Sequence, residues 1–113
     1  MKSTVIVEVS VVPIGTAHAS LSRYVADCLS VLNKTGGIKY KLTPMGTIIE
    51  GELDAVLQVV RKMHEEPFKK GILRVVTTIK IDDRRDKKAS MQKKIESVLK
   101  HNPDIRTVKI RYD

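Results

Sequence analysis

The order of strand-like and helix-like segments is the feature that most constrains the fold of this chain. Stretches rich in β-branched residues or with period-two alternation predict strands, and these stretches occur at 4–12, 38–42, 47–50 and 72–81. Apolar residues at helical spacing occur at 21–32, 53–63 and 91–99. The order βαββαβ, followed by a further helix, is the split βαβ pattern of ferredoxin-like folds. We therefore predict an α+β fold in which two helices cover one face of a four-stranded antiparallel sheet. A short last strand could follow at 105–112.

The first strand has two different faces. One face carries only apolar residues, namely Val5, Val7, Val9 and Val11. The other mixes apolar with polar residues, namely Ile6, Glu8, Ser10 and Val12. The first face is expected to meet the helices, and the second to lie on the open side of the sheet. A half-apolar open face is typically covered by a partner subunit, a ligand or both.

Proline, glycine and hydroxyl residues mark the predicted boundaries of the early elements. Pro13 and Gly15 are expected to end the first strand, and Thr16 or Ser20 could cap the helix that follows. Pro44 and Gly46 interrupt two alternating runs, which predicts a β-hairpin.

The second helix should begin near Glu52 or Asp54 and continue to Lys69-Lys70, because acidic side chains stabilise a helix N-terminus and basic side chains its C-terminus. Gly71 is expected to terminate it. In the strand that follows, alternation places Arg74 and Thr78 on the open face.

Composition indicates one soluble domain spanning residues 1–113. Hydrophobic residues make up 42% and aromatic residues only 4%, so the core is expected to be aliphatic. No segment reaches the roughly 18 apolar residues of a membrane helix, and Glu8 interrupts the apolar run that a secretory signal would need. The single cysteine, Cys28, is predicted to be a buried hydrophobe rather than a nucleophile. These features favour a reducing cytoplasm.

The formal charge of +8 comes from 21 basic and 13 acidic residues and would suit an anionic partner. Much of it lies in the second half, at Arg84-Arg85, Lys87-Lys88 and Lys93-Lys94. Base stacking needs exposed aromatic side chains, of which the chain has few, so a solvated basic face is favoured over a nucleic-acid surface. Binding of nucleic acid or another polyanion is the alternative function. The acids interleaved with Arg84 and Arg85 are expected to pair with them in a solvated turn.

No catalytic or metal-binding pattern is recognisable. His18, His64 and His101 belong to separate elements without paired ligands, which argues against a zinc site. The chain has no GxSxG motif, P-loop or Rossmann glycine pattern. We therefore predict a non-enzymatic protein that requires no cofactor.

Several segments together resemble the small thiamine-binding-protein-like family, whose members have long been listed as uncharacterised. The most specific are PMGTIIEGE (44–52) and RVVTTIKIDDRRDK (74–87), and the others are EVSVVPIG (8–15), ASLSRYVADCL (19–29) and MQKKIESV (91–98). The resemblance implies a ferredoxin-like fold, homodimers or homotetramers, and binding of thiamine or its hydroxymethylpyrimidine moiety. Residues 104–113 lie beyond it.

A thiamine site needs a carboxylate, hydroxyl or backbone groups and a flat apolar wall. The predicted ligand-binding residues are Ser10, Thr16, Met45, Gly46, Thr47, Glu50, Arg74 and Thr78. Glu50 is expected to face the open side and hold the aminopyrimidine edge. The alternative is that Glu50 forms a structural ion pair with Arg74 across the sheet, and both roles could hold together. The ligand site is predicted to lie at a subunit interface.

Overall fold

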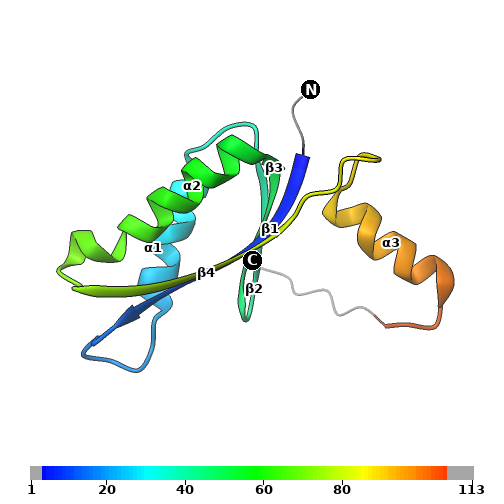
Figure 1. Ribbon diagram of the computed structural model, residues 1–113. Helices are drawn as coiled ribbons and strands as arrows, with labels where there is room; N and C mark the ends of the chain where they lie inside the picture. The colour runs from blue at the N-terminus through cyan, green and yellow to red at the C-terminus, as the bar shows by residue number, and fades with distance from the viewer. Residues whose placement is uncertain (1–3, 107–113) are drawn as a thin grey trace.

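The computed structural model describes residues 4–106 and confirms the predicted order of elements (Figure 1). The elements are β1 (Thr4–Ile14), α1 (Ser22–Asn33), β2 (Lys39–Thr43), β3 (Gly46–Glu52), α2 (Leu53–Glu65), a 3₁₀ turn η1 (Pro67–Lys70), β4 (Arg74–Asp82) and α3 (Met91–His101). The possible strand at 105–112 lies mostly outside the described residues.

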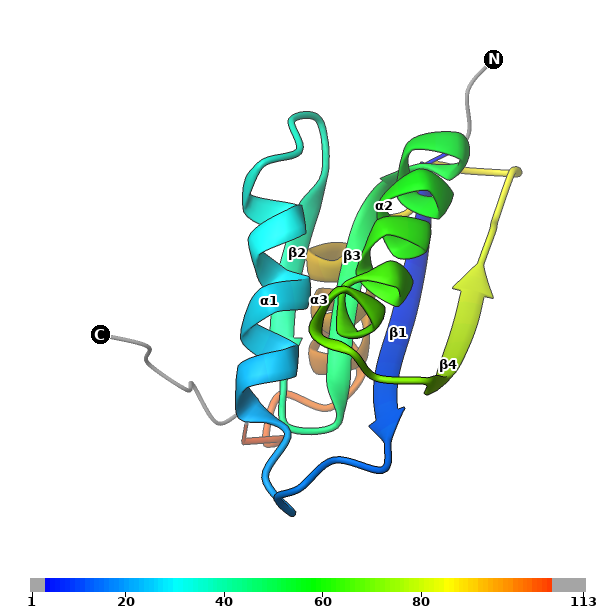
Figure 2. The same cartoon turned by 90° about the vertical axis from the view of Figure 1, so that its left-hand side faces the viewer.

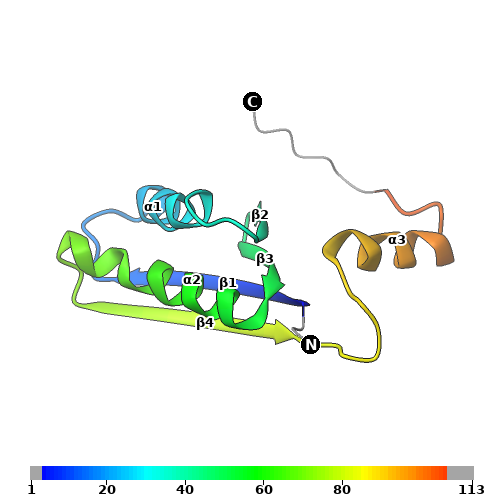
Figure 3. The ribbon, with the colours of Figure 1, turned by 90° about the horizontal axis from the view of Figure 1, so that it is seen from above.

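The four strands form one antiparallel sheet in the order β2-β3-β1-β4. Helices α1 and α2 lie side by side over one face, and α3 lies behind the sheet on the other side, near β2 and β3 (Figure 2). Seen from above, α3 stands apart from the two-layer body at the end of a long connection from β4 (Figure 3). The ferredoxin-like layers are thus as predicted, and α3 partly covers the face that we expected to be open.

The core lies between the sheet and the two helices. It is built from alternate residues of β1 and β3 and from one stripe of each helix: Val5, Val7, Val9, Ile49, Cys28, Leu32, Val56, Val59, Val60 and Met63. Burying a large aliphatic side chain contributes about 1.5–3 kcal/mol, so the period-two pattern of β1 dictates which face the helices cover. Leu57, which shares the apolar periodicity of α2, stays 38% exposed at the border of the core.

Helix capping is only partly as predicted. Neither Thr16 nor Ser20 is the cap residue of α1, because Leu21 holds that position and no side chain caps it; the Thr16 hydroxyl instead donates to the carbonyl of His18 at 2.6 Å. In α2 the prediction is confirmed, since Glu52 is the N-cap and its Oε2 accepts the N–H of Ala55 at 3.0 Å.

Three predicted boundaries are wrong. β1 continues through Pro13 to Ile14, because β4 pairs with it along this length. On the other side of β1, β3 pairs only as far as Val9, so the N–H that Pro13 lacks is not needed for hydrogen bonds to β3. α2 ends at Glu65 rather than Lys70, because Pro67 starts a separate 3₁₀ turn that Gly71 closes at φ 84°. β4 starts at Arg74 rather than at residue 72.

Candidate functional site

The strand register separates the two charged residues that were expected to pair. On the open face Glu50 lies opposite Ile6, whereas Arg74 lies opposite Ile14. Eight residues of β1 separate these positions, which corresponds to about 27 Å along the strand. The predicted Glu50–Arg74 ion pair is therefore wrong, and Arg74 lies at the far end of the sheet from Glu50.

Glu50 is covered by the start of α3. Its side chain points to the predicted face, but the residue is only 9% exposed. The start of α3 lies against it, and its Oε1 accepts the backbone N–H of Met91 at 2.7 Å. Its Oε2 lies 4.0 Å from Nζ of Lys39, whose side chain is 80% exposed. A carboxylate at a helix N-terminus is stabilised by the unpaired N–H groups and the helix dipole, so Glu50 holds α3 against the sheet. Our expectation that Glu50 is freely available on an open face is wrong.

A cavity of about 260 Å³ lies where the hairpin turn meets the end of β1. We call it the hairpin cavity. Its apolar wall comes from the sheet and both helices and includes Val9, Val11, Leu21, Val25, Leu42 and Met63. Four of the predicted ligand-binding residues also line it: Ser10, Met45, Gly46 and Thr47. The PMGT segment (44–47) and residues 9–12 of β1 thus line the same cavity.

Thr47 is the most unusual residue of this cavity. It is 4% exposed, yet its hydroxyl is not among the fully buried side-chain atoms that lack a hydrogen-bond partner. The Thr47 hydroxyl therefore retains access to the cavity that the residue lines. Because Thr47 borders the cavity, its hydroxyl can form a hydrogen bond with a ligand atom.

Local geometry explains why the hairpin turn has this composition. The hydroxyl of Thr43 donates to the carbonyl of Gly46 at 2.8 Å, which closes the turn around Pro44 and Met45. At Gly46 an added Cβ would lie 3.0 Å from the carbonyl oxygen of Val9, so any larger residue would force the turn away from β1. Met45 is 86% exposed.

The other predicted site residues lie elsewhere. Thr78 is the cross-strand neighbour of Ser10 on the open face and does not line the hairpin cavity. Thr16 lines a separate hollow between the β1–α1 loop and the start of α1. The structure thus brings four of the eight predicted residues together and separates the other four from them.

The prediction from sequence missed the cavity residues contributed by helices, such as Leu21, Val25 and Cys28. Their spacing marks them as core, and nothing in that spacing distinguishes a residue beside a cavity from one packed on all sides. Burial raises the pKa of the Cys28 thiol to about 11, with the nearby Glu66 and Asp27 carboxylates adding to the effect, and the thiol donates to the carbonyl of Met63 at 3.4 Å. Cys28 therefore presents a neutral thiol to the cavity.

The charged turn after β4 is self-paired, as predicted. Arg84 donates to Asp86 at 2.6 and 2.9 Å, and Arg85 donates to Asp83 at 2.8 Å. These hydrogen bonds hold the pKa of each aspartate below its usual value. Within residues 4–106 there is no group of three or more histidine, cysteine or acidic side chains that could hold a metal ion, and no helix there is long and apolar enough to cross a membrane.

Comparison with known proteins places this geometry in a family. Residues 7–99 match the model of the thiamine-binding protein family. The UPF0045 protein YqgV of Bacillus subtilis is 54% identical over 99 residues, which cover 85% of this chain and 95% of the relative. A UPF0045 protein of Methanothermobacter thermautotrophicus is 44% identical over 92 residues, covering 80% of this chain and 92% of the relative.

Solved structures show the same fold. A hypothetical protein of Methanocaldococcus jannaschii superimposes with a TM-score of 0.77 at 34% identity, covering 85% of this chain and 96% of that chain. A Thermotoga maritima protein, named for a proposed role in thiamine biosynthesis or salvage, gives a TM-score of 0.69 at 21% identity, covering 84% and 98%. At that identity the second likeness concerns the fold alone.

Proposed function

Because the chain belongs to the thiamine-binding protein family, we propose that it binds thiamine or its hydroxymethylpyrimidine moiety in the hairpin cavity without catalysing a reaction. The observation that carries this proposal is Thr47, a polar residue that is only 4% exposed and lines the otherwise mainly apolar cavity. An aminopyrimidine ring offers hydrogen-bond donors and acceptors along one edge and an apolar face. The cavity offers the Thr47 hydroxyl and an aliphatic wall, and Ser10 lines it from a strand position whose side chain lies on the open face of the sheet.

Size and charge favour the pyrimidine portion as the buried part of the ligand. The volume of about 260 Å³ is slightly below the roughly 300–1,000 Å³ of typical small-molecule sites. No charged side chain lines the cavity, so it offers no counter-ion to the thiazolium cation of thiamine. The neutral ring would enter, and the remainder of thiamine would extend past the exposed Met45.

We further propose that the protein is a homodimer or homotetramer and that a second copy closes the mouth of this site. The support is apolar surface that a monomer leaves in water. On β4, which is an edge strand of the sheet, Val76, Ile79 and Ile81 are 42–46% exposed, and on α3 Ile95 and Val98 are 47% and 56% exposed. Apolar surface of this kind on an unpaired sheet edge favours association.

Calorimetry with hydroxymethylpyrimidine and thiamine tests the ligand proposal. Thr47→Val keeps the shape of the side chain and removes its hydroxyl, so pyrimidine affinity should fall about 5- to 30-fold, the equivalent of about 1–2 kcal/mol. The melting temperature should not fall, because the variant keeps the side-chain volume and the side-chain hydrogen bonds of the described residues do not involve this hydroxyl. Thr4→Val is the matched control, since Thr4 lies at the opposite end of β1, and its affinity should stay within twofold. If neither compound binds at millimolar concentration, or if Thr47→Val binds as tightly as the parent, the proposal is wrong.

A further inference from the structure

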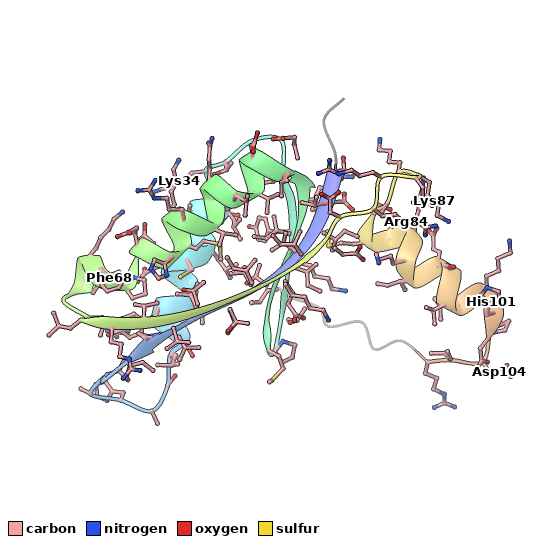
Figure 4. The ribbon with its side chains drawn as sticks, in the orientation of Figure 1. Lys34, Phe68, Arg84, Lys87, His101 and Asp104 are labelled. Atoms are coloured by element: carbon pink, nitrogen blue, oxygen red, sulfur yellow. The ribbon has the colours of Figure 1, made fainter. Side chains whose placement is uncertain are left out.

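A second hollow lies at the other end of the sheet, between the β4–α3 loop and the first turns of α3. It measures about 500 Å³ and is lined by five cationic side chains, Arg84, Lys87, Lys88, Lys93 and Lys94, together with Ala89, Ser90 and Ser97. We call it the basic hollow. Figure 4 shows Arg84 and Lys87 at the start of α3, on the opposite side of the molecule from η1. No carboxylate and no aromatic side chain lines it.

The charges of the basic hollow are only partly neutralised within the chain. Arg84 pairs with Asp86, and Lys94 pairs with Asp82. Lys87, Lys88 and Lys93 form no salt bridge with any residue in the described range 4–106. Clustered like charges repel one another, and a surface lined by one sign of charge concentrates the opposite ion. The hollow is therefore suited to an anion that can meet several ammonium groups at once.

The N-terminus of α3 does not supply free N–H groups for an anion at Met91 or Lys93. The Ser90 hydroxyl accepts the N–H of Lys93 at 3.1 Å, and Glu50 accepts the N–H of Met91 at 2.7 Å. Both N–H groups have internal partners, and the Glu50 carboxylate already offsets the helix dipole. An anion would therefore be held by side chains.

We propose that the basic hollow binds a small molecule through two or three linked phosphate groups. Lysine binds phosphate as a point charge, and arginine can add paired hydrogen bonds. Three ammonium groups without a salt bridge match the charge of a di- or triphosphate group better than that of a single phosphate. Single-stranded nucleic acid is disfavoured because its binding sites combine cations with aromatic side chains that stack on the bases.

This site is independent of the hairpin cavity. The start of α3 lies beside Glu50, opposite Ile6 at the beginning of β1, whereas the hairpin cavity is lined by Val9 to Val12 near the other end of that strand. The two sites also share no lining residue. Either proposal can therefore fail while the other stands.

Calorimetry of the full chain with sodium tripolyphosphate, pyrophosphate and orthophosphate at about 50 mM salt provides the test. Affinity should rise with the number of phosphates and fall steeply as salt increases. The variant Lys87→Gln, Lys88→Gln, Lys93→Gln should lose at least tenfold in tripolyphosphate affinity. The matched control is Lys34→Gln, Lys62→Gln, Lys69→Gln, which removes the same charge from three lysines lining a groove between α1 and α2 and should lose less than threefold.

Three outcomes would overturn the proposal. They are the absence of tripolyphosphate binding at low salt, an equal loss in the control variant, and tenfold tighter binding of a single-stranded oligonucleotide, which would indicate a nucleic-acid surface. Circular dichroism and melting establish that each variant is folded. If the triple variant does not fold, the single variant Lys88→Glu, at an exposed loop position, carries the same expectation. Pyrimidine affinity should be the same in the parent and in these variants.

Discussion

Removing the carboxylate of Glu50 should release α3 while leaving the two-layer core folded. Within the described residues, the polar contact between α3 and β3 is the bond from the N–H of Met91 to Oε1 of Glu50, and no residue of α3 is buried. The core on the other face of the sheet contains no residue of α3. A second charged contact joins Lys94 of α3 to Asp82 at the end of β4, but both side chains are about half exposed, and exposed ion pairs contribute only about 0–1 kcal/mol. The position of α3 should therefore depend on the charge-assisted hydrogen bond to Glu50 more than on packing or on this ion pair.

The magnitude follows from the groups involved. A hydrogen bond to a charged group contributes about 1.5–3 kcal/mol, and a neutral one about 0.5–1.5 kcal/mol. Glu50→Gln keeps an acceptor and loses the charge, so it should weaken the docking of α3 by about 1 kcal/mol. Glu50→Ala removes the acceptor and should cost about 2 kcal/mol. The exposed Lys39 contact at 4.0 Å adds little, since surface ion pairs contribute about 0–1 kcal/mol.

Hydrogen exchange read by mass spectrometry measures this release directly. Amides in the first turns of α3 should exchange about 5-fold faster in Glu50→Gln and about 30-fold faster in Glu50→Ala, whereas amides of β1 around Val7 should not change. Glu8→Gln is the matched control, because it removes one exposed carboxylate from the same face and should change neither. Unchanged exchange in α3 combined with a lower melting temperature of the core would refute the role of Glu50 as the tether of α3.

Three further predictions can be tested on the same preparation. Light scattering at micromolar concentration should report a dimer or tetramer, and a particle of 12.7 kDa would contradict the proposed association. Burial raises the pKa of the Cys28 thiol to about 11, so roughly one molecule in a thousand carries the reactive thiolate at pH 8. Labelling with a thiol reagent should therefore be slow at pH 8 and accelerate as the pH rises toward 11. Rapid labelling of the folded protein at pH 7 would contradict the burial of this thiol. Gly51→Ala should lower the free energy of unfolding by about 1–3 kcal/mol, because the new Cβ would lie 2.9 Å from a methyl of Ile38 and 3.1 Å from one of Val56. An unchanged urea midpoint would contradict this prediction, because it would show that Ile38 and Val56 move aside without loss of stability.

Sequence patterns predicted the local elements well where one physical signal dominated. The valine alternation of β1 specified both a strand and the face that the helices cover, because burying the other face would place Glu8 in the core. Pro44 and Gly46 specified the hairpin, since proline has a fixed φ that suits a turn and glycine adopts backbone conformations that other residues avoid. Boundaries failed where tertiary pairing outweighed the local signal, as at Pro13, which remains in β1 because β4 pairs along it.

The candidate site was harder to predict because it depends on distances across the sheet. Alternation placed Glu50 and Arg74 correctly on one face, but alternation carries no information on register, and the register puts them at opposite ends. Ser10 and Thr47 lie on neighbouring strands near one end of the sheet, and both reach the same cavity.

The sequence by itself determined the order of the elements, the face of each strand and the excess of basic residues around α3, because these depend on local periodicity and composition. Only the tertiary structure decided that Glu50 holds the start of α3 from 41 residues away, that Thr47 borders a cavity, and that five cations share one hollow. Each of these depends on how strand register and loop path bring distant residues together, and neither register nor loop path is specified by the residues that meet.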